Sequence, residues 1–281
     1  MTRPLHRTMD SARRADEVLY LYCLAQPSAS VTTYSSGENG EREVERILCQ
    51  DIVAVVSHVR AEEFCGPEAE AKMADLTWMG PRVCRHEKVV EQTMHLSPVI
   101  PARFATLFSS PERLVGWLSA NHDVIAGALD RFAEHQEWSV KGTLNEPEAV
   151  RRILAAARSP EGAVRSLAPG RNYLEERRKQ GGARQELRTW TKGVCALVSR
   201  DLGGYAEEFR EREIGSDGGA DPRTTRILNW AFLVHQHRVD AFSACLERLN
   251  VRHGEQGLAF QLSGPWPPYS FSPSLERDAT P

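Results

Sequence analysis

The chain has 281 residues, enough for one large hydrophobic core or two smaller ones, and two domains is the better expectation at this length. Its net charge of −3 comes from 38 acidic and 35 basic residues, so it lacks the basic excess that binding to nucleic acid requires. The six cysteines are widely spread without CxxC or Cys/His spacing, which indicates reduced, buried thiols and argues against a disulfide or zinc framework.

Residues 1–16 do not have the pattern expected of a targeting signal. Residues 1–16 are polar and basic with no apolar run after them, which excludes a signal peptide and predicts a disordered leader. No apolar stretch is long enough to span a bilayer. Residues 18–24 and 51–59 are almost entirely apolar and predict buried strands. Between them we expect a polar loop over 26–40 and a short helical turn over 43–49.

Residues 75–94 have the period of a helix. Apolar side chains recur every three or four residues, and Pro81 fits only in a first turn, so we expect the regular helix to begin just before it. His86 lies on the apolar stripe, which indicates a hydrogen-bonded core histidine more than a ligand. The pair His86-Glu87 is not part of an HExxH zinc motif, because residue 90 is valine.

The following stretch mixes strands and helices. Residues 98–104 predict a short strand at a sheet edge because they include Pro101, and Ser110-Pro111 predicts the start of a helix that runs through residue 133. Residues 137–144 alternate as a strand, with Trp138, Val140 and Leu144 expected inward and Glu137, Ser139 and Lys141 outward. A helix is expected over 146–157. Strands and helices without regular βαβα alternation indicate an α+β fold.

The C-terminal half begins after a Pro- and Gly-rich boundary at 159–170. A polar helix over 172–179 and a long amphipathic helix over 187–209 are expected first, then a loop over 214–222. A strand, a helix and a final strand follow, at 226–235, 237–249 and 258–263. The expected organisation is an N-terminal α+β domain at 17–158, a compact ferredoxin-like domain with a long helix at 159–271, and a tail at 272–281.

The sequence offers little for catalysis. It has no Gly-rich phosphate loop, no GxSxG elbow and no nucleophile with an obvious base beside it. His235 and His237 form the only arrangement with plausible metal geometry, but no third ligand type lies near them in the sequence. We therefore expect no catalytic residues, no cofactor and no metal ion.

The closing segment, residues 258–271, stands apart in composition. Pro265, Pro267 and Pro268 lack an amide donor and favour an extended backbone, so the segment should be stiff. It carries Trp266, Tyr269 and Phe271. Aromatic rings on a stiff segment lose little entropy on packing, which suits either a strap along the domain's own edge or a contact with a partner. The residues alone favour the strap.

Several stretches together resemble the GvpF/GvpL family of gas vesicle proteins. They are VLYLYCL (18–24), DIVAVVSHV (51–59), WMGPRVCRHEKVVE (78–91), PVIPARFATLF (98–108), EWSVKG (137–142), NYLEERRK (172–179) and SGPWPPYSF (263–271). The last is the most specific, and all occur in the family's order. One departure is Ala105, where the family often has glycine; alanine predicts an ordinary backbone conformation there.

This resemblance implies a minor, non-enzymatic protein of the gas vesicle and the cytoplasm, built from two α+β domains, the second a modified ferredoxin-like fold. It further implies binding to the hydrophobic, GvpA-like shell subunit and to other accessory proteins during nucleation, which limits aggregation. Apolar surface suited to such a partner is expected at Trp266, Tyr269 and Phe271 and on the outer face of the long helix. The alternative is an enzyme or ligand-sensing module on a ferredoxin-like scaffold.

Overall fold

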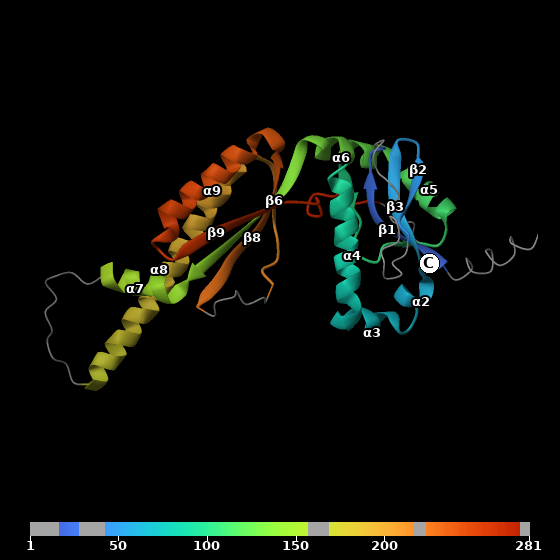
Figure 1. The fold of residues 1–281 in the computed structure, drawn as a ribbon. Coiled ribbons are helices and arrows are strands. Elements are labelled where there is room, and N and C mark those ends of the chain that lie inside the picture. The colour runs from blue at the N-terminus through green and yellow to red at the C-terminus, as the bar shows by residue number, and fades with distance from the viewer. Residues whose placement is uncertain (1–16, 28–42, 157–168, 216–222, 276–281) are drawn as a thin grey trace, which may run out of the picture. The chain divides into compact units, whose positions relative to one another are not determined.

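The computed structural model of the chain describes residues 17–27, 43–156, 169–215 and 223–275. The chain divides into two compact units: unit 1 comprises residues 1–134 and 267–281, and unit 2 comprises residues 135–266. Both are built around antiparallel sheets with helices, so the α+β class is confirmed (Figure 1). The predicted leader and most of the tail lie outside the described residues.

The sheet of unit 1 has the order β2-β3-β1-β4, and β5 also pairs with β1. Its strands are β1 (Glu17–Ala25), β2 (Glu45–Cys49), β3 (Ile52–Arg60), β4 (Val99–Pro101) and β5 (Leu107–Phe108). The two apolar strands of the sequence, β1 and β3, lie side by side at its centre. Pro101 ends the short edge strand β4, as its missing amide donor favours.

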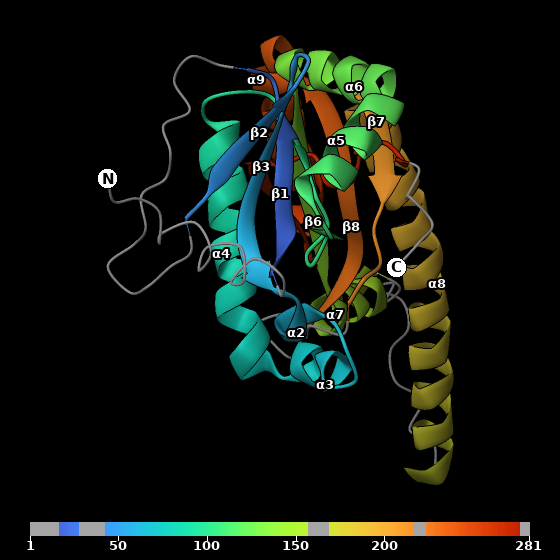
Figure 2. The same cartoon turned by 90° about the vertical axis from the view of Figure 1, so that its right-hand side faces the viewer.

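Helices cover both faces of this sheet, which explains why β1 and β3 are apolar on both sides (Figures 1 and 2). They are α2 (Ala61–Phe64), α3 (Ala69–Ala74), α4 (Leu76–Met94), α5 (Pro111–Ala120) and α6 (His122–Glu134). Helix α4 lies on one face, where Val89 and Val90 join Tyr20, Tyr22 and Val55 in one buried cluster. Helices α5 and α6 lie on the other face.

Three local predictions for unit 1 are wrong. Residues 43–49 contain the strand β2 in place of a helical turn, because pairing with β3 outweighs a weak local preference. Helix α4 begins at Leu76, since the Asp75 carboxylate accepts the Thr77 amide (2.8 Å) and caps it, and Pro81 lies inside the helix. The helix expected through residue 133 is interrupted at Asn121, whose side chain donates to the Trp117 carbonyl (2.9 Å).

The sheet of unit 2 has the order β7-β8-β6-β9, all antiparallel. Its strands are β6 (His135–Asn145), β7 (Ala206–Glu211), β8 (Thr224–His235) and β9 (Leu258–Trp266); its helices are α7 (Glu146–Ala156), α8 (Pro169–Gly203), the 3-10 turn η1 (Gln236–Arg238) and α9 (Val239–Gly254). With α7 and α8 in the first crossover, the chain follows the β-α-β-β-α-β order that a ferredoxin-like arrangement requires.

Helices α8 and α9 lie against the same face of this sheet (Figure 1), and the apolar stripe of α8 is buried there. Gly142 in β6 is required by close packing: a Cβ atom at this position would lie 2.6 Å from Leu228 Cγ. Among the described residues, no helix combines the length and the apolar character needed to cross a membrane.

Two predictions for this half of the chain differ from the structure. The domain division falls at residues 134/135, not at 158/159, because β6 is the strand between β8 and β9. The long helix ends at Gly203, and Phe209 lies in β7 against Trp230 (5.2 Å between ring centroids).

Two side chains of β6 are also misassigned. Glu137 and Ser139 were expected to face outward, but both are buried. Arg212 forms an ion pair with Glu137, and its guanidinium lies 3.4 Å from Ser139 Oγ as a donor. A strand pattern predicts which residues share a face. It does not predict that a polar face is buried, which becomes possible when a cationic side chain from a distant part of the chain pairs with it.

Candidate partner-binding surface

The proline-rich part of the closing segment begins inside β9, where the pairing with β6 shifts between Ser139↔Ser263 and Glu137↔Trp266. Gly264 has φ = 141°, and a Cβ atom there would lie 3.0 Å from both the Glu137 carbonyl oxygen and Trp138 Cε3. Only glycine combines that backbone conformation with so close an approach to the neighbouring strand. The irregularity near the end of β9 therefore depends on glycine at residue 264.

The residues after Trp266 belong to unit 1. Pro267 and Pro268 are buried, and two tight turns follow them: the Tyr269 amide donates to the Pro267 carbonyl (2.7 Å) and the Phe271 amide to the Pro268 carbonyl (3.1 Å). The segment is thus a strap, as the residues alone predict, but it packs on the N-terminal unit. We call residues 267–272 the C-terminal strap.

The three aromatic residues singled out in the sequence have different surroundings. Trp266 is 42 % exposed and its indole N–H donates to Ser263 Oγ (3.2 Å). Tyr269 is 37 % exposed, whereas Phe271 is only 6 % exposed and lies in the interior of unit 1. The structure therefore presents two of the three rings to solvent and uses the third as an anchor.

Tyr269 is held by helix α4. Its hydroxyl donates to Glu87 Oε1 (2.8 Å), and Glu87 is half-buried. Burial raises the pKa of the Glu87 carboxyl, which the hydrogen bond from Tyr269 partly offsets. Burial, and then the hydrogen bond to Glu87, raise the pKa of Tyr269, so the phenol stays protonated and remains a donor.

His86 itself is a core histidine, as the sequence predicts. Its Nε2 lies 3.1 Å from the Ala102 carbonyl, which can only accept, so Nε2 carries the proton and Nδ1 accepts from the Tyr20 hydroxyl (2.9 Å). That hydroxyl in turn accepts from the Ala105 amide (3.2 Å). The network ties α4 to β1 and to the β4–β5 loop.

The expectation of an ordinary backbone at Ala105 is wrong. This residue has φ = 61°, the left-handed region that favours glycine, and in that conformation its amide meets the Tyr20 hydroxyl. The hydrogen-bond network therefore maintains a conformation that alanine alone disfavours.

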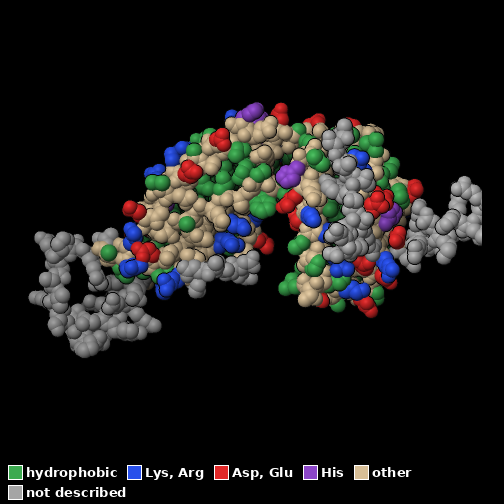
Figure 3. Space-filling view, viewed as in Figure 1, with side chains coloured by type: hydrophobic (Ala, Val, Ile, Leu, Met, Phe, Trp, Pro, Cys, Tyr) green, Lys and Arg blue, Asp and Glu red, His purple; other side chains and the backbone are tan. Residues whose placement is uncertain are grey.

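The other candidate groups of the sequence do not form a site. The rings of His235 and His237 lie 5.1 Å apart, but in the described part of the chain no three His, Cys, Asp or Glu side chains are placed to hold a metal ion. Within residues 181–203 of α8 the exposed positions are mostly polar, including Arg188, Lys192 and Arg200, so this part of its outer face is not the apolar surface that the sequence predicts. On the face shown in Figure 3, acidic and basic side chains are interspersed over both units.

Comparison with known proteins agrees with this fold and these sequence stretches. The family described as gas vesicle synthesis protein GvpL/GvpF matches residues 18–273. Gas vesicle protein L of Streptomyces sp. (strain CB03234) is 26% identical over 265 residues, covering 94% of this chain and 96% of its own. Gas vesicle protein F of the same strain is also 26% identical, over 274 residues, covering 90% of this chain and 98% of its own.

Solved structures show the same fold. The crystal structure of GvpF from Anabaena sp. PCC7120 superposes with a TM-score of 0.66 at 19% sequence identity, covering 92% of this chain and 99% of that one. GvpF from Microcystis aeruginosa gives a TM-score of 0.59 at 16% identity with the same coverage. Since the family match extends over nearly the whole sequence, this chain belongs to the gas vesicle synthesis protein GvpL/GvpF family.

Proposed function

We propose that this protein acts, without catalysis, in the assembly and nucleation of gas vesicles, in the cytoplasm and at the vesicle. In this role it binds the hydrophobic, GvpA-like shell subunit and other gas vesicle accessory proteins and limits their aggregation. Membership of the GvpL/GvpF family and relatives named gas vesicle proteins L and F support the gas vesicle role.

The observation that carries the binding proposal is the pair of exposed aromatic rings of Trp266, just before the C-terminal strap, and Tyr269, within it. Trp266 and Tyr269 stay accessible although the segment between them, Pro267-Pro268, is buried. Aromatic residues dominate binding energy at protein interfaces, and a ring on a backbone that is already fixed loses little further entropy when it binds. Phe271 acts as the anchor of this segment.

The test is co-expression of this protein with the shell subunit, followed by pull-down and measurement of the soluble fraction of the subunit. We expect the wild-type protein to bind the subunit and keep it soluble. The double variant Trp266→Ala/Tyr269→Ala should weaken binding by about 2 kcal/mol or more, the usual cost of losing aromatic anchors. The single variant Tyr269→Phe keeps the aromatic ring but removes the hydroxyl that donates to Glu87. It therefore distinguishes the contribution of the ring to binding from that of the hydrogen bond.

Leu48→Ala is the matched control, because Leu48 is 62 % exposed and lies on β2, outside the proposed surface. It removes exposed apolar area without touching the strap, so binding should be unchanged. A folded double variant that binds the subunit like the wild type would contradict the assigned surface. A wild-type protein that neither binds the subunit nor keeps it soluble would contradict direct binding altogether.

A further inference from the structure

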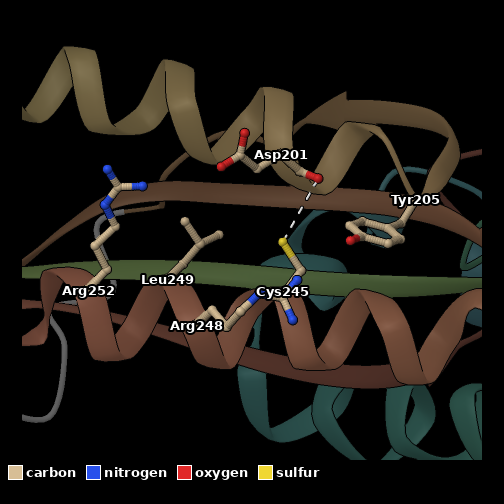
Figure 4. Close-up of a pocket in the computed structure, with 6 residues that line it drawn as sticks. All are labelled: Asp201, Tyr205, Cys245, Arg248, Leu249 and Arg252. Atoms are coloured by element: carbon tan, nitrogen blue, oxygen red, sulfur yellow. Dashed lines mark hydrogen bonds between the residues drawn. The ribbon is translucent and has the colours of Figure 1, made fainter.

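A cavity of about 380 Å³ lies between α8 and α9 on the helical side of unit 2. Figure 4 shows the six side chains that line it. Two come from the C-terminal end of α8 and the residues just after it, and four from α9; they are Asp201, Tyr205, Cys245, Arg248, Leu249 and Arg252. The volume lies within the range of small-ligand pockets, about 300–1,000 Å³.

The charge in this cavity is predominantly positive. Arg248 and Arg252 stand one helical turn apart on α9, so their side chains share one face. Among the described residues neither forms an ion pair with a carboxylate; Arg248 contacts the Cys245 thiol. Asp201 is already engaged, because Arg200 donates to its Oδ1 through Nε (3.1 Å) and Nη2 (3.0 Å).

The inner wall of the cavity is neutral. Leu249 is buried, and the Cys245 thiol lies 4.0 Å from the Asp201 carbonyl oxygen as a donor. Burial raises the pKa of this thiol, with the nearby Arg248 acting in the opposite direction, so the thiol contributes no negative charge at neutral pH. Tyr205 adds a phenol at the end of the cavity (Figure 4).

We propose that this cavity binds a small anion whose charged group is a carboxylate or a phosphate. Guanidinium groups bind both through paired, charge-assisted hydrogen bonds, and two of them facing one cavity without a carboxylate partner match such a ligand. Leu249 and Cys245 then contact its less polar part. This binding site shares no residue with the aromatic surface assigned to the shell subunit, because its residues come from α8, from Tyr205 just after it, and from α9.

The test is calorimetric titration of the full-length protein with inorganic phosphate and, separately, with citrate, at constant ionic strength set by sodium chloride. We expect saturable binding of at least one of these anions. Arg252→Gln should weaken it by at least about tenfold, the usual consequence of losing one hydrogen bond to a charged group. Arg252→Lys keeps the positive charge but loses the paired N–H donors of the guanidinium group. Its affinity should therefore lie between those of Arg252→Gln and the wild type.

Arg113→Gln is the matched control: it removes one exposed arginine from α5 in unit 1 and should leave the affinity unchanged. Circular dichroism verifies that each variant is folded, which is expected because Arg252 is exposed. Absence of saturable binding to the wild-type protein for both anions would overturn the proposal. Equal affinity in Arg252→Gln and wild type would also overturn it, because the anion would then bind elsewhere.

Discussion

His86 illustrates how a titratable side chain becomes part of a core. It is 1 % exposed, its two ring nitrogens are occupied by Tyr20 and Ala102, and burial lowers its pKa to about 4 although the bond to Ala102 opposes this. The neutral ring suits the network, since a protonated Nδ1 can no longer accept from the Tyr20 hydroxyl. Aromatic rings around it, including Phe104 (6.1 Å), exclude water.

This lowered pKa predicts acid sensitivity of unit 1. Between the unfolded pKa of 6.5 and the folded pKa of about 4, the unfolded chain takes up a proton that the folded protein rejects. The free energy of unfolding should therefore fall as the pH drops, by about 3 kcal/mol at pH 4 relative to pH 7 from this group alone. Urea unfolding at several pH values measures how the free energy of unfolding depends on pH.

The control for this prediction is His86→Gln, whose amide can donate to the Ala102 carbonyl and accept from Tyr20 but does not titrate. We expect its stability to depend less on pH between 6.5 and 4 than that of the wild type. An identical pH dependence in both proteins would show that other groups cause the acid sensitivity.

Ala105 carries a second prediction at the scale of one residue. A non-glycine residue in the left-handed region costs about 1–2 kcal/mol of strain, which a glycine would relieve. Glycine also gives the unfolded chain more conformational freedom, which lowers the free energy of unfolding by about 0.4–1 kcal/mol. Ala105→Gly should therefore stabilise unit 1 by about 0.5–1 kcal/mol, visible as a higher urea midpoint. A lower midpoint would mean that the alanine methyl group makes contacts worth more than the relieved strain.

At the scale of helices and strands, strong periodic patterns located the elements and weak ones did not. The strands β1, β3, β6 and β8 and the helices α4, α7 and α9 lie where the apolar periods predict them, apart from their ends. The sequence of β2 has no clear apolar period, and the strand forms because its backbone pairs with the edge of β3. The apolar spacing of α8 continued by coincidence into β7, although Gly203 and Gly204 mark the end of the helix.

For the strap, the sequence predicts a stiff segment but does not predict the surface on which it packs. Its prolines favour an extended backbone, but the structure forms two tight turns over residues 267–271. Which surface it packs on depends on Glu87 and the interior of unit 1, which are about 180 residues away in sequence. The sequence therefore indicated three equivalent aromatic residues, whereas the structure separates the exposed Trp266 and Tyr269 from the buried Phe271.

At the scale of the whole molecule, the chain leaves unit 1 at Glu134, builds all of unit 2, and returns to unit 1 at Pro267. Unit 1 is thus completed by the last segment of the chain. The same segment bears Tyr269, one of the two exposed aromatic residues assigned to partner binding, so we expect loss of the strap to affect stability as well as binding.

Phe271→Ala tests this completion. Removing a buried phenylalanine ring usually costs about 3–5 kcal/mol, and the loss should fall on unit 1 because Phe271 lies in its interior. Hydrogen exchange measures this directly: amides of β1 should lose protection while those of β8 keep theirs. Trp266→Ala, which removes a more exposed ring, should leave both sets nearly unchanged. Equal loss in β1 and β8 would contradict the assignment of the strap to unit 1.

By itself the sequence determined the α+β class, most elements and the family, because these depend on local apolar periods and on short stretches kept in a fixed order. The tertiary structure decided where the units divide, which polar residues are buried and which aromatic rings stay exposed. These features depend on contacts between residues far apart in the chain: Glu137 with Arg212, Glu87 with Tyr269, and β6 with β8 and β9. A local pattern contains no information about which distant surface will meet it, and the cavity between α8 and α9 arises only where two such helices meet.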